Sequence, residues 1–138
     1  NGLCRKGASR YRRGMDDTAR FAEGAAYIRG NYVPIAEACI PVTDWGFTRS
    51  DAVYDVVHVF AGGFFRLQDH LDRFARSMQA RRLAPREGRA EIESALHSCV
   101  ALTGLADAYV AMVALRGRPR VAGSRRPADC GRPQARCS

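Results

Sequence analysis

The chain has 138 residues, of which 46% are hydrophobic and 26% charged, and it carries a formal net charge of +8 at pH 7. This composition is typical of one globular domain and excludes a fibrous or intrinsically disordered protein. The longest nearly apolar run, residues 53–65, is interrupted by Asp55 and His58 and is shorter than the roughly 20 residues that a membrane-spanning helix needs.

The positive charge lies at the two ends of the chain. Residues 1–14 have a net charge of +5 and residues 116–138 of +6, whereas residues 15–115 have a net charge of −3. Because the middle is acidic, it attracts phosphate backbones poorly, and we expect no nucleic-acid partner. A small basic module that binds nucleic acid through its Arg-rich ends is the alternative.

The same division predicts three regions. Residues 1–14 are expected to be a basic, disordered leader, residues 15–116 a folded domain, and residues 117–138 an Arg-, Pro- and Gly-rich tail that cannot bury an apolar face. A compact domain rarely ends in a long structureless tail, so we expect an incomplete piece of a longer protein.

The cysteines and histidines predict neither a disulfide framework nor a metal site. None of the five cysteines forms a C-x-x-C pair, and the three histidines do not stand at spacings that complete a metal-ligand set. No apolar segment typical of a secretory signal occurs in the first 24 residues. We therefore expect a cytoplasmic protein with reduced thiols, in which Cys39 and Cys99 are small core residues.

The patterned sequence begins with a predicted hairpin. Residues 25–29 and 32–33 are expected to be strands joined by Gly30 and Asn31, which tolerate the positive φ of a tight turn. Pro34 restricts the second strand to an edge or an end of a sheet. A further extended piece is expected at residues 40–42.

Residues 53–60 give the clearest strand prediction, after an expected loop over residues 44–47. Val53, Asp55, Val57 and Val59 fall on one face of this strand, and Tyr54, Val56, His58 and Phe60 fall on the other. Residues 61–63 are predicted as a turn and residues 64–67 as the returning strand.

Two helices and a last strand complete the predicted elements. Asp69 is expected to cap a helix whose apolar residues recur up to Leu83 and which stops near Pro85. Residues 89–102 are predicted as a second helix, and residues 108–115 as a strand. This order predicts an α+β fold, with two helices packed on one side of a mostly antiparallel sheet.

Residue type and spacing alone suggest a chemical role for few residues. Arg73 lies in the first helix, where its planar fork suits a phosphate, although a surface arginine is the simpler interpretation. Tyr54 and Tyr109 could line a pocket or belong to the core. Asp51 and Asp55 are interpreted as hydrogen-bonded turn carboxylates and not as an acid–base pair.

Three runs in order resemble a known family. The sequences GAAYIRGNYVP (24–34), DWGFTRSDAVYDV (44–56) and FRLQDHLDRF (65–74) resemble the class IV aminotransferases, the pyridoxal-phosphate enzymes of fold type IV. That family includes branched-chain, D-amino-acid and (R)-selective amine transaminases. The resemblance extends to about residue 116 and corresponds to the small N-terminal domain.

The resemblance implies an activity and partners. It implies transfer of an amino group between an amino acid or amine and a 2-oxo acid, with pyridoxal 5'-phosphate as the cofactor and a homodimer as the intact enzyme. A class IV lyase, such as an aminodeoxychorismate lyase, is an alternative with the same cofactor site. In either case no membrane partner is expected.

The resemblance also implies roles for individual residues. The arginine of the family's H-L-x-R motif binds the cofactor's phosphate and corresponds to Arg73. The family's pocket residues correspond to Tyr54 and Val56 on one strand and to Tyr109 and Ala111 on another.

Two pocket positions and the catalytic group depart from the family pattern. Arg49 stands where several amine transaminases carry His, and Ala111 stands where they carry an acid. The family's catalytic Lys lies in the second half of its members, whereas the one lysine here is Lys6. We therefore expect no catalytic residue in this chain and no transamination by this polypeptide alone.

Overall fold

The computed structural model describes residues 17–118 and 135–136. The expected leader over residues 1–14 and most of the expected tail over residues 117–138 lie outside these residues. The elements run in the order α1 (Asp17–Arg20), β1 (Ala25–Ile28), β2 (Asn31–Pro34), η1 (Ile35–Glu37), α2 (Trp45–Thr48), β3 (Ala52–Phe60), β4 (Gly63–Phe64), α3 (Leu67–Ala80), α4 (Arg89–Thr103), β5 (Ala108–Leu115) and β6 (Ala135–Arg136).

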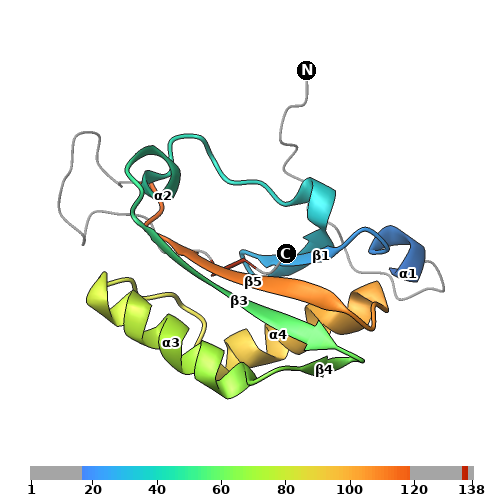
Figure 1. Cartoon of the computed structure of the whole chain (residues 1–138). Helices are drawn as coiled ribbons and strands as arrows, with labels where there is room; N and C mark the ends of the chain where they lie inside the picture. The colour runs from blue at the N-terminus through green and yellow to red at the C-terminus, as the bar shows by residue number, and fades with distance from the viewer. Residues whose placement is uncertain (1–16, 119–134, 137–138) are drawn as a thin grey trace.

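The strands form two antiparallel sheets. One sheet pairs β1 with β2, and the other has the strand order β4-β3-β5-β6. Helices α3 and α4 lie together on one side of β3 and β5 (Figure 1). The predicted α+β class, with two helices on one side of a mostly antiparallel sheet, is confirmed.

The first hairpin turns one residue earlier than predicted. Arg29 and Gly30 occupy the turn with φ of 54° and 80°, while Asn31 already pairs with Ile28 as part of β2. Because Gly30 lacks a Cβ, it adopts this positive φ without steric cost. Pro34 ends β2, as its missing N–H predicts.

Strands β3 and β5 form the longest ladder of the fold. They pair antiparallel from Ala52 opposite Leu115 to Val59 opposite Ala108. The predicted alternation is confirmed, because Asp55, Val57 and Val59 are buried and the residues between them are exposed. Strand β4 pairs only with Val59 and Phe60. Strand β5 occupies one edge of β3. Along residues 52–57, no described strand pairs with the opposite edge of β3.

Helix α3 begins before the predicted cap. The chain enters it through Arg66, whose φ is 52°, and Asp69 lies in the first turn, where it accepts a 2.5 Å hydrogen bond from Nε of Arg66. The predicted strand over residues 64–67 is therefore wrong beyond Phe64, since the left-handed conformation of Arg66 redirects the chain into the helix.

Helix α3 also ends before Pro85, whereas α4 agrees with its prediction. The last residue of α3 is Ala80, and Leu83 is buried outside the helix, with its N–H donating to the carbonyl of Met78 at 2.9 Å. Helix α4 follows Gly88, whose N–H donates to Oε2 of Glu91 at 2.7 Å, and it is followed by Gly104 at a φ of 67°.

The segment before β3 differs most from its prediction. Residues 40–42 form no strand, and the expected loop over residues 44–47 overlaps helix α2. Oδ1 of Asp44 accepts a hydrogen bond from the Gly46 N–H at 2.7 Å, as an N-cap carboxylate does.

A pair of hydrogen bonds joins the start of α2 to the end of β5. The N–H of Trp45 donates to the carbonyl of Gly117 at 3.0 Å. The N–H of Gly117 donates to Oδ1 of Asp44 at 3.2 Å. These two bonds therefore hold residues 44 and 45 against residue 117, the two ends of the segment that contains the β3–β5 ladder.

The hydrophobic core fills the space between the sheet and the two long helices. Its largest fully buried hydrophobic side chains are Phe21, Phe74, Leu96, Met112, Val57 and Val59. Cys99 belongs to this core as predicted, whereas the prediction for Cys39 is wrong, because that residue follows η1 in a connecting segment and is exposed. Within the described residues, no helix is long and apolar enough to cross a membrane.

Candidate functional site

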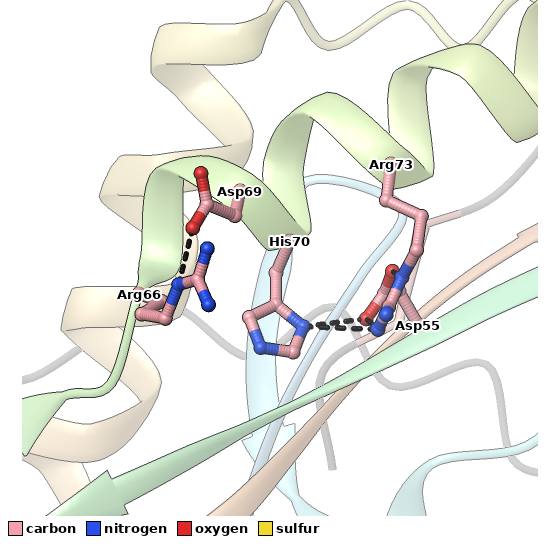
Figure 2. Close-up of polar contacts among 5 residues, drawn as sticks. All are labelled: Asp55, Arg66, Asp69, His70 and Arg73. Atoms are coloured by element: carbon pink, nitrogen blue, oxygen red, sulfur yellow. Dashed lines mark hydrogen bonds and ion pairs between the residues drawn. The ribbon is translucent and has the colours of Figure 1, made fainter.

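Arg73 on α3 binds the one carboxylate on the buried face of β3. Asp55 is 4% exposed and stands in line with Val57 and Val59. Nε of Arg73 donates to its Oδ2 at 2.6 Å and Nη2 donates to its Oδ1 at 2.7 Å. Figure 2 shows the guanidinium reaching from the helix down to the strand. This two-point contact fixes the plane of the guanidinium.

His70 completes a three-residue cluster. Its Nδ1 lies 2.8 Å from Oδ1 of Asp55 and 3.2 Å from Nη2 of Arg73. An ionised carboxylate only accepts hydrogen bonds, so Nδ1 of His70 carries the hydrogen and donates it to Asp55. His70 and Arg73 face the same side of α3 because they are three residues apart.

The charges of the cluster stabilise one another. Burial by itself would raise the pKa of Asp55, but the hydrogen bonds and positive charges of Arg73 and His70 outweigh it and hold that pKa below its ordinary 3.8. The hydrogen bonds and charge of Asp55 in turn raise the pKa of Arg73. Asp55 is therefore ionised and Arg73 charged at neutral pH.

Part of the Arg73 guanidinium is left for another ligand. Guanidinium has five N–H donors, and Asp55 takes one from Nε and one from Nη2. The end formed by Nη1 and the second Nη2 hydrogen has the spacing that suits two oxygens of a phosphate. The side chain is 60% exposed, so a ligand can reach this end.

Four of the predicted pocket residues share the other face of the sheet. Tyr54 and Tyr109 are 75% and 72% exposed, and Val56 stands opposite Ala111 in the β3–β5 ladder. Tyr109 stacks on His58 with 4.7 Å between ring centroids. These residues point away from Asp55, since successive residues of a strand face opposite sides.

Arg49 lies apart from both groups. It follows the last residue of α2, and its guanidinium carbon lies 4.6 Å from the centre of the Trp45 ring. The structure therefore places the predicted site residues in three separate regions. Arg73 lies between α3 and β3, four residues lie on the open face of the sheet, and Arg49 lies at the end of α2.

Sequence reasoning missed two residues of the cluster. It treated Asp55 as a turn carboxylate, whereas Asp55 holds Arg73 from 18 residues away. It gave His70 no role. The signal that pointed to Asp55 was a single charged residue in the buried stripe of β3, because a buried carboxylate needs a cationic partner. Within the described residues, no group of three His, Cys, Asp or Glu residues could hold a metal ion.

Comparison with known proteins identifies the family. The sequence model of the amino-transferase class IV family matches residues 52–134. A putative branched-chain-amino-acid aminotransferase of Methanocaldococcus jannaschii is 26% identical over 111 residues, which are 80% of this chain and 38% of that protein. A D-alanine aminotransferase of Staphylococcus aureus is 31% identical over 51 residues, which are 37% of this chain and 18% of that protein.

Solved structures show the same fold. The branched-chain aminotransferase of Thermoproteus uzoniensis, crystallised with norvaline, has a TM-score of 0.72 and 22% identity, and the match covers 83% of this chain and 39% of that one. The branched-chain aminotransferase of Escherichia coli has a TM-score of 0.74 and 17% identity, with 83% and 38% covered.

These matches cover only part of the relatives. The chain spans 38% of the length of the M. jannaschii protein. The family match extends to residue 134, so a boundary of the folded domain at residue 116 stays a prediction. The family match nevertheless covers more than half of the chain, and the chain belongs to the class IV aminotransferases.

Proposed function

We propose that this chain is the N-terminal part of a pyridoxal-phosphate-dependent transaminase. Residues 15–116 would form its N-terminal domain, and the intact enzyme would be a cytoplasmic homodimer. It would transfer an amino group between an amino acid or amine and a 2-oxo acid. Family membership supports the reaction class, and the names of the relatives support amino-acid substrates.

The observation that carries the proposal is the Asp55–Arg73 pair. A cofactor phosphate needs a cationic fork of fixed orientation, and Asp55 fixes the guanidinium of Arg73 at two points. The outward end of that guanidinium is accessible. The residues present therefore fit the phosphate of pyridoxal phosphate, and Arg73 would hold it.

The remaining proposed residues would surround the reacting groups. Tyr54, Val56, Tyr109 and Ala111 share one face of β3 and β5, and Arg49 stands near one end of that sheet. A ligand held by Arg73 could reach the face of Tyr54 past the edge of β3 at residues 52–57, where no described strand pairs. The aromatic rings would then exclude water from one side of the ligand.

The reaction also needs a group that the described residues lack. Bound pyridoxal phosphate supplies an electron sink for the bonds of the amino-bearing carbon. A lysine amine would hold the cofactor and move the proton. The one lysine of the sequence, Lys6, lies outside the described residues, and family members carry their catalytic lysine in the second half.

The polypeptide alone should therefore not transaminate. We expect the purified 138-residue chain, supplied with pyridoxal phosphate, to give no exchange between amino acids and 2-oxo acids above the rate of the free cofactor. A chimera in which residues 17–117 replace the corresponding part of the M. jannaschii relative should be active. Exchange by the chain alone would contradict the assignment of the missing lysine.

The role of Arg73 can be tested without the missing part. Pyridoxine 5'-phosphate carries an alcohol instead of the aldehyde, so it cannot react with Lys6. We expect it to bind the full chain weakly and to shift the NMR signal of the Arg73 Nε–H. Arg73→Gln should weaken binding at least about tenfold, because a charge-assisted hydrogen bond is lost.

Arg76→Gln is the matched control, since Arg76 is an exposed arginine on the same helix. This variant should bind pyridoxine 5'-phosphate like the unaltered chain. Pyridoxine without the phosphate should not bind. Equal binding by Arg73→Gln, or equal binding of pyridoxine, would show that Arg73 does not recognise the phosphate.

A further inference from the structure

A second charged site lies at the other end of α3 from His70. A cavity of about 460 Å³ opens there, lined by Trp45, Arg49, Asp51, Ala80, Arg81, Arg82 and Arg116. We call it the arginine pocket. Arg81 follows Arg73 by eight residues, or roughly 12 Å along a helix. Neither Arg73 nor Tyr54 lines the pocket, so it is separate from the phosphate site proposed at Arg73, whereas Arg49 belongs both to this pocket and to the proposed substrate pocket.

Arg116 is a largely buried lining residue of the arginine pocket. Its side chain is 12% exposed. Nε donates to Oδ2 of Asp51 at 2.9 Å, and Nη2 donates to Oδ1 at 3.2 Å. Its Nη1 and Nη2 also donate to the carbonyls of Arg82 and Arg81 at 2.8 and 2.5 Å. Arg116 therefore joins the end of α3 to the sheet and neutralises Asp51.

The other three arginines of the pocket keep their charge uncompensated. Arg66, Arg73 and Arg89 each face a carboxylate within 4.0 Å. Within the described residues, no such partner faces Arg49, Arg81 or Arg82. The guanidinium of Arg49 lies over the ring of Trp45, an attraction that orients it without cancelling its charge.

The concentration of charge indicates the ligand. Like charges gathered in one concave site repel one another and raise the local concentration of anions. The planar forks of arginine match the oxygens of phosphate groups. The one acid among the lining residues, Asp51, is already paired with Arg116.

We propose that the arginine pocket binds a phosphate-class oxyanion with at least two negative charges. Arg81 and Arg82 bind it from the end of α3, and Arg49 binds it from α2. Arg116 keeps these elements together. The site goes beyond the proposed transaminase function, because it uses neither Arg73 nor the open face of the sheet and shares only Arg49 with the residues proposed above to surround the reacting groups.

Trp45 gives a direct readout, since it is the single tryptophan of the chain and lines the pocket. Pyrophosphate is titrated into the full chain while the fluorescence of Trp45 is followed, with sodium chloride at matched ionic strength as the reference. We expect a saturable change with pyrophosphate and none with chloride. A linear response, or the same response to chloride, would overturn the proposal.

A double variant tests which residues bind the anion. The side chains of Arg81 and Arg82 are exposed, so Arg81→Gln/Arg82→Gln should fold like the unaltered chain, as circular dichroism would verify. We expect about tenfold weaker binding of pyrophosphate. Unchanged affinity in this double variant would contradict the assignment.

Two further titrations distinguish this site from the cofactor site and identify the ligand class. Arg73→Gln should leave the Trp45 response to pyrophosphate unchanged, whereas its loss would show that the anion binds at Arg73 and would overturn the separate site. ATP in place of pyrophosphate distinguishes the sources of phosphate. Similar affinities would assign recognition to the phosphates, and tighter binding of ATP would assign the pocket to a nucleotide.

Discussion

The two faces of the β3–β5 ladder are made by alternate residues of the same strands, yet they differ completely in their surroundings. On one face Val57, Val59 and Met112 are at most 1% exposed under the helices. On the other face Tyr54, Phe60 and Tyr109 are at least 69% exposed. Stability is therefore concentrated on the covered face, and the residues of the open face have little part in the core. A slip of one residue would exchange the two sets.

The largest expected effect comes from removing a packed side chain beneath the covered face. Leu96 of α4 is fully buried, so Leu96→Ala removes packed atoms and leaves a cavity. We expect the free energy of unfolding to fall by about 2–5 kcal/mol, measured by urea denaturation. The matched control is Leu105→Ala, because Leu105 is 44% exposed, and it should change stability by about 0.5 kcal/mol or less. Equal losses would show that the helices do not form the core.

The next effect concerns the one charged residue on the covered face. The pKa of Asp55 is lower in the folded chain than its ordinary 3.8, so its ionised form stabilises the fold. This contribution is complete above about pH 4 and is lost as the pH falls through the lowered value, because the unfolded chain then binds more protons. Asp55→Asn should reduce stability at neutral pH, by less than Leu96→Ala, and should remove this acid-dependent part.

Asp69→Asn is the control for the acid dependence. Asp69 pairs with Arg66, which directly precedes the helix, but both side chains are more than half exposed, and such pairs contribute little. Urea denaturation between pH 2 and 7 should therefore give nearly the same curve for Asp69→Asn as for the unaltered chain. If Asp55→Asn kept the acid dependence, another carboxylate would be responsible for it.

Sequence patterns predicted the covered face better than the contacts across it. The alternation of β3 and the helical spacing of Leu71, Phe74 and Met78 depend on local periodicity, and both agree with the structure. The pairing of Asp55 with Arg73 joins two elements, so spacing along the chain gives no direct sign of it. The resemblance to a family assigned Arg73 a role, but it did not reveal what orients its guanidinium.

The errors of prediction have local physical causes. Phe64, Phe65 and Leu67 look like a strand, but Arg66 adopts a left-handed conformation that propensity does not anticipate. The Asp44 cap produces a short helix where a loop over residues 44–47 was predicted. The cavity beside Arg49 was not foreseen, because it needs Arg116 to meet the end of α3, more than 30 residues away in sequence.

The smallest expected effect comes from the open face. Tyr54→Thr removes an exposed ring and keeps a residue that favours strands, so stability should change by about 0.5 kcal/mol or less. Light scattering should show less self-association, since an exposed apolar patch becomes smaller. Val57→Thr, the same new side chain on the covered face, should cost about 1–3 kcal/mol because its hydroxyl is buried. Equal costs at the two positions would contradict the difference between the faces.

The two hydrogen bonds between the start of α2 and Gly117 have a mechanical consequence. Tension applied at Arg118, directly after Gly117, reaches these bonds before it reaches the β3–β5 ladder. The bonds of Trp45 and Asp44 with Gly117 would therefore open first, whereas the many bonds of the ladder would share the remaining load. In a single-molecule pulling experiment, α2 would separate from the end of β5 at low force, and the packed sheet would yield only at a higher one.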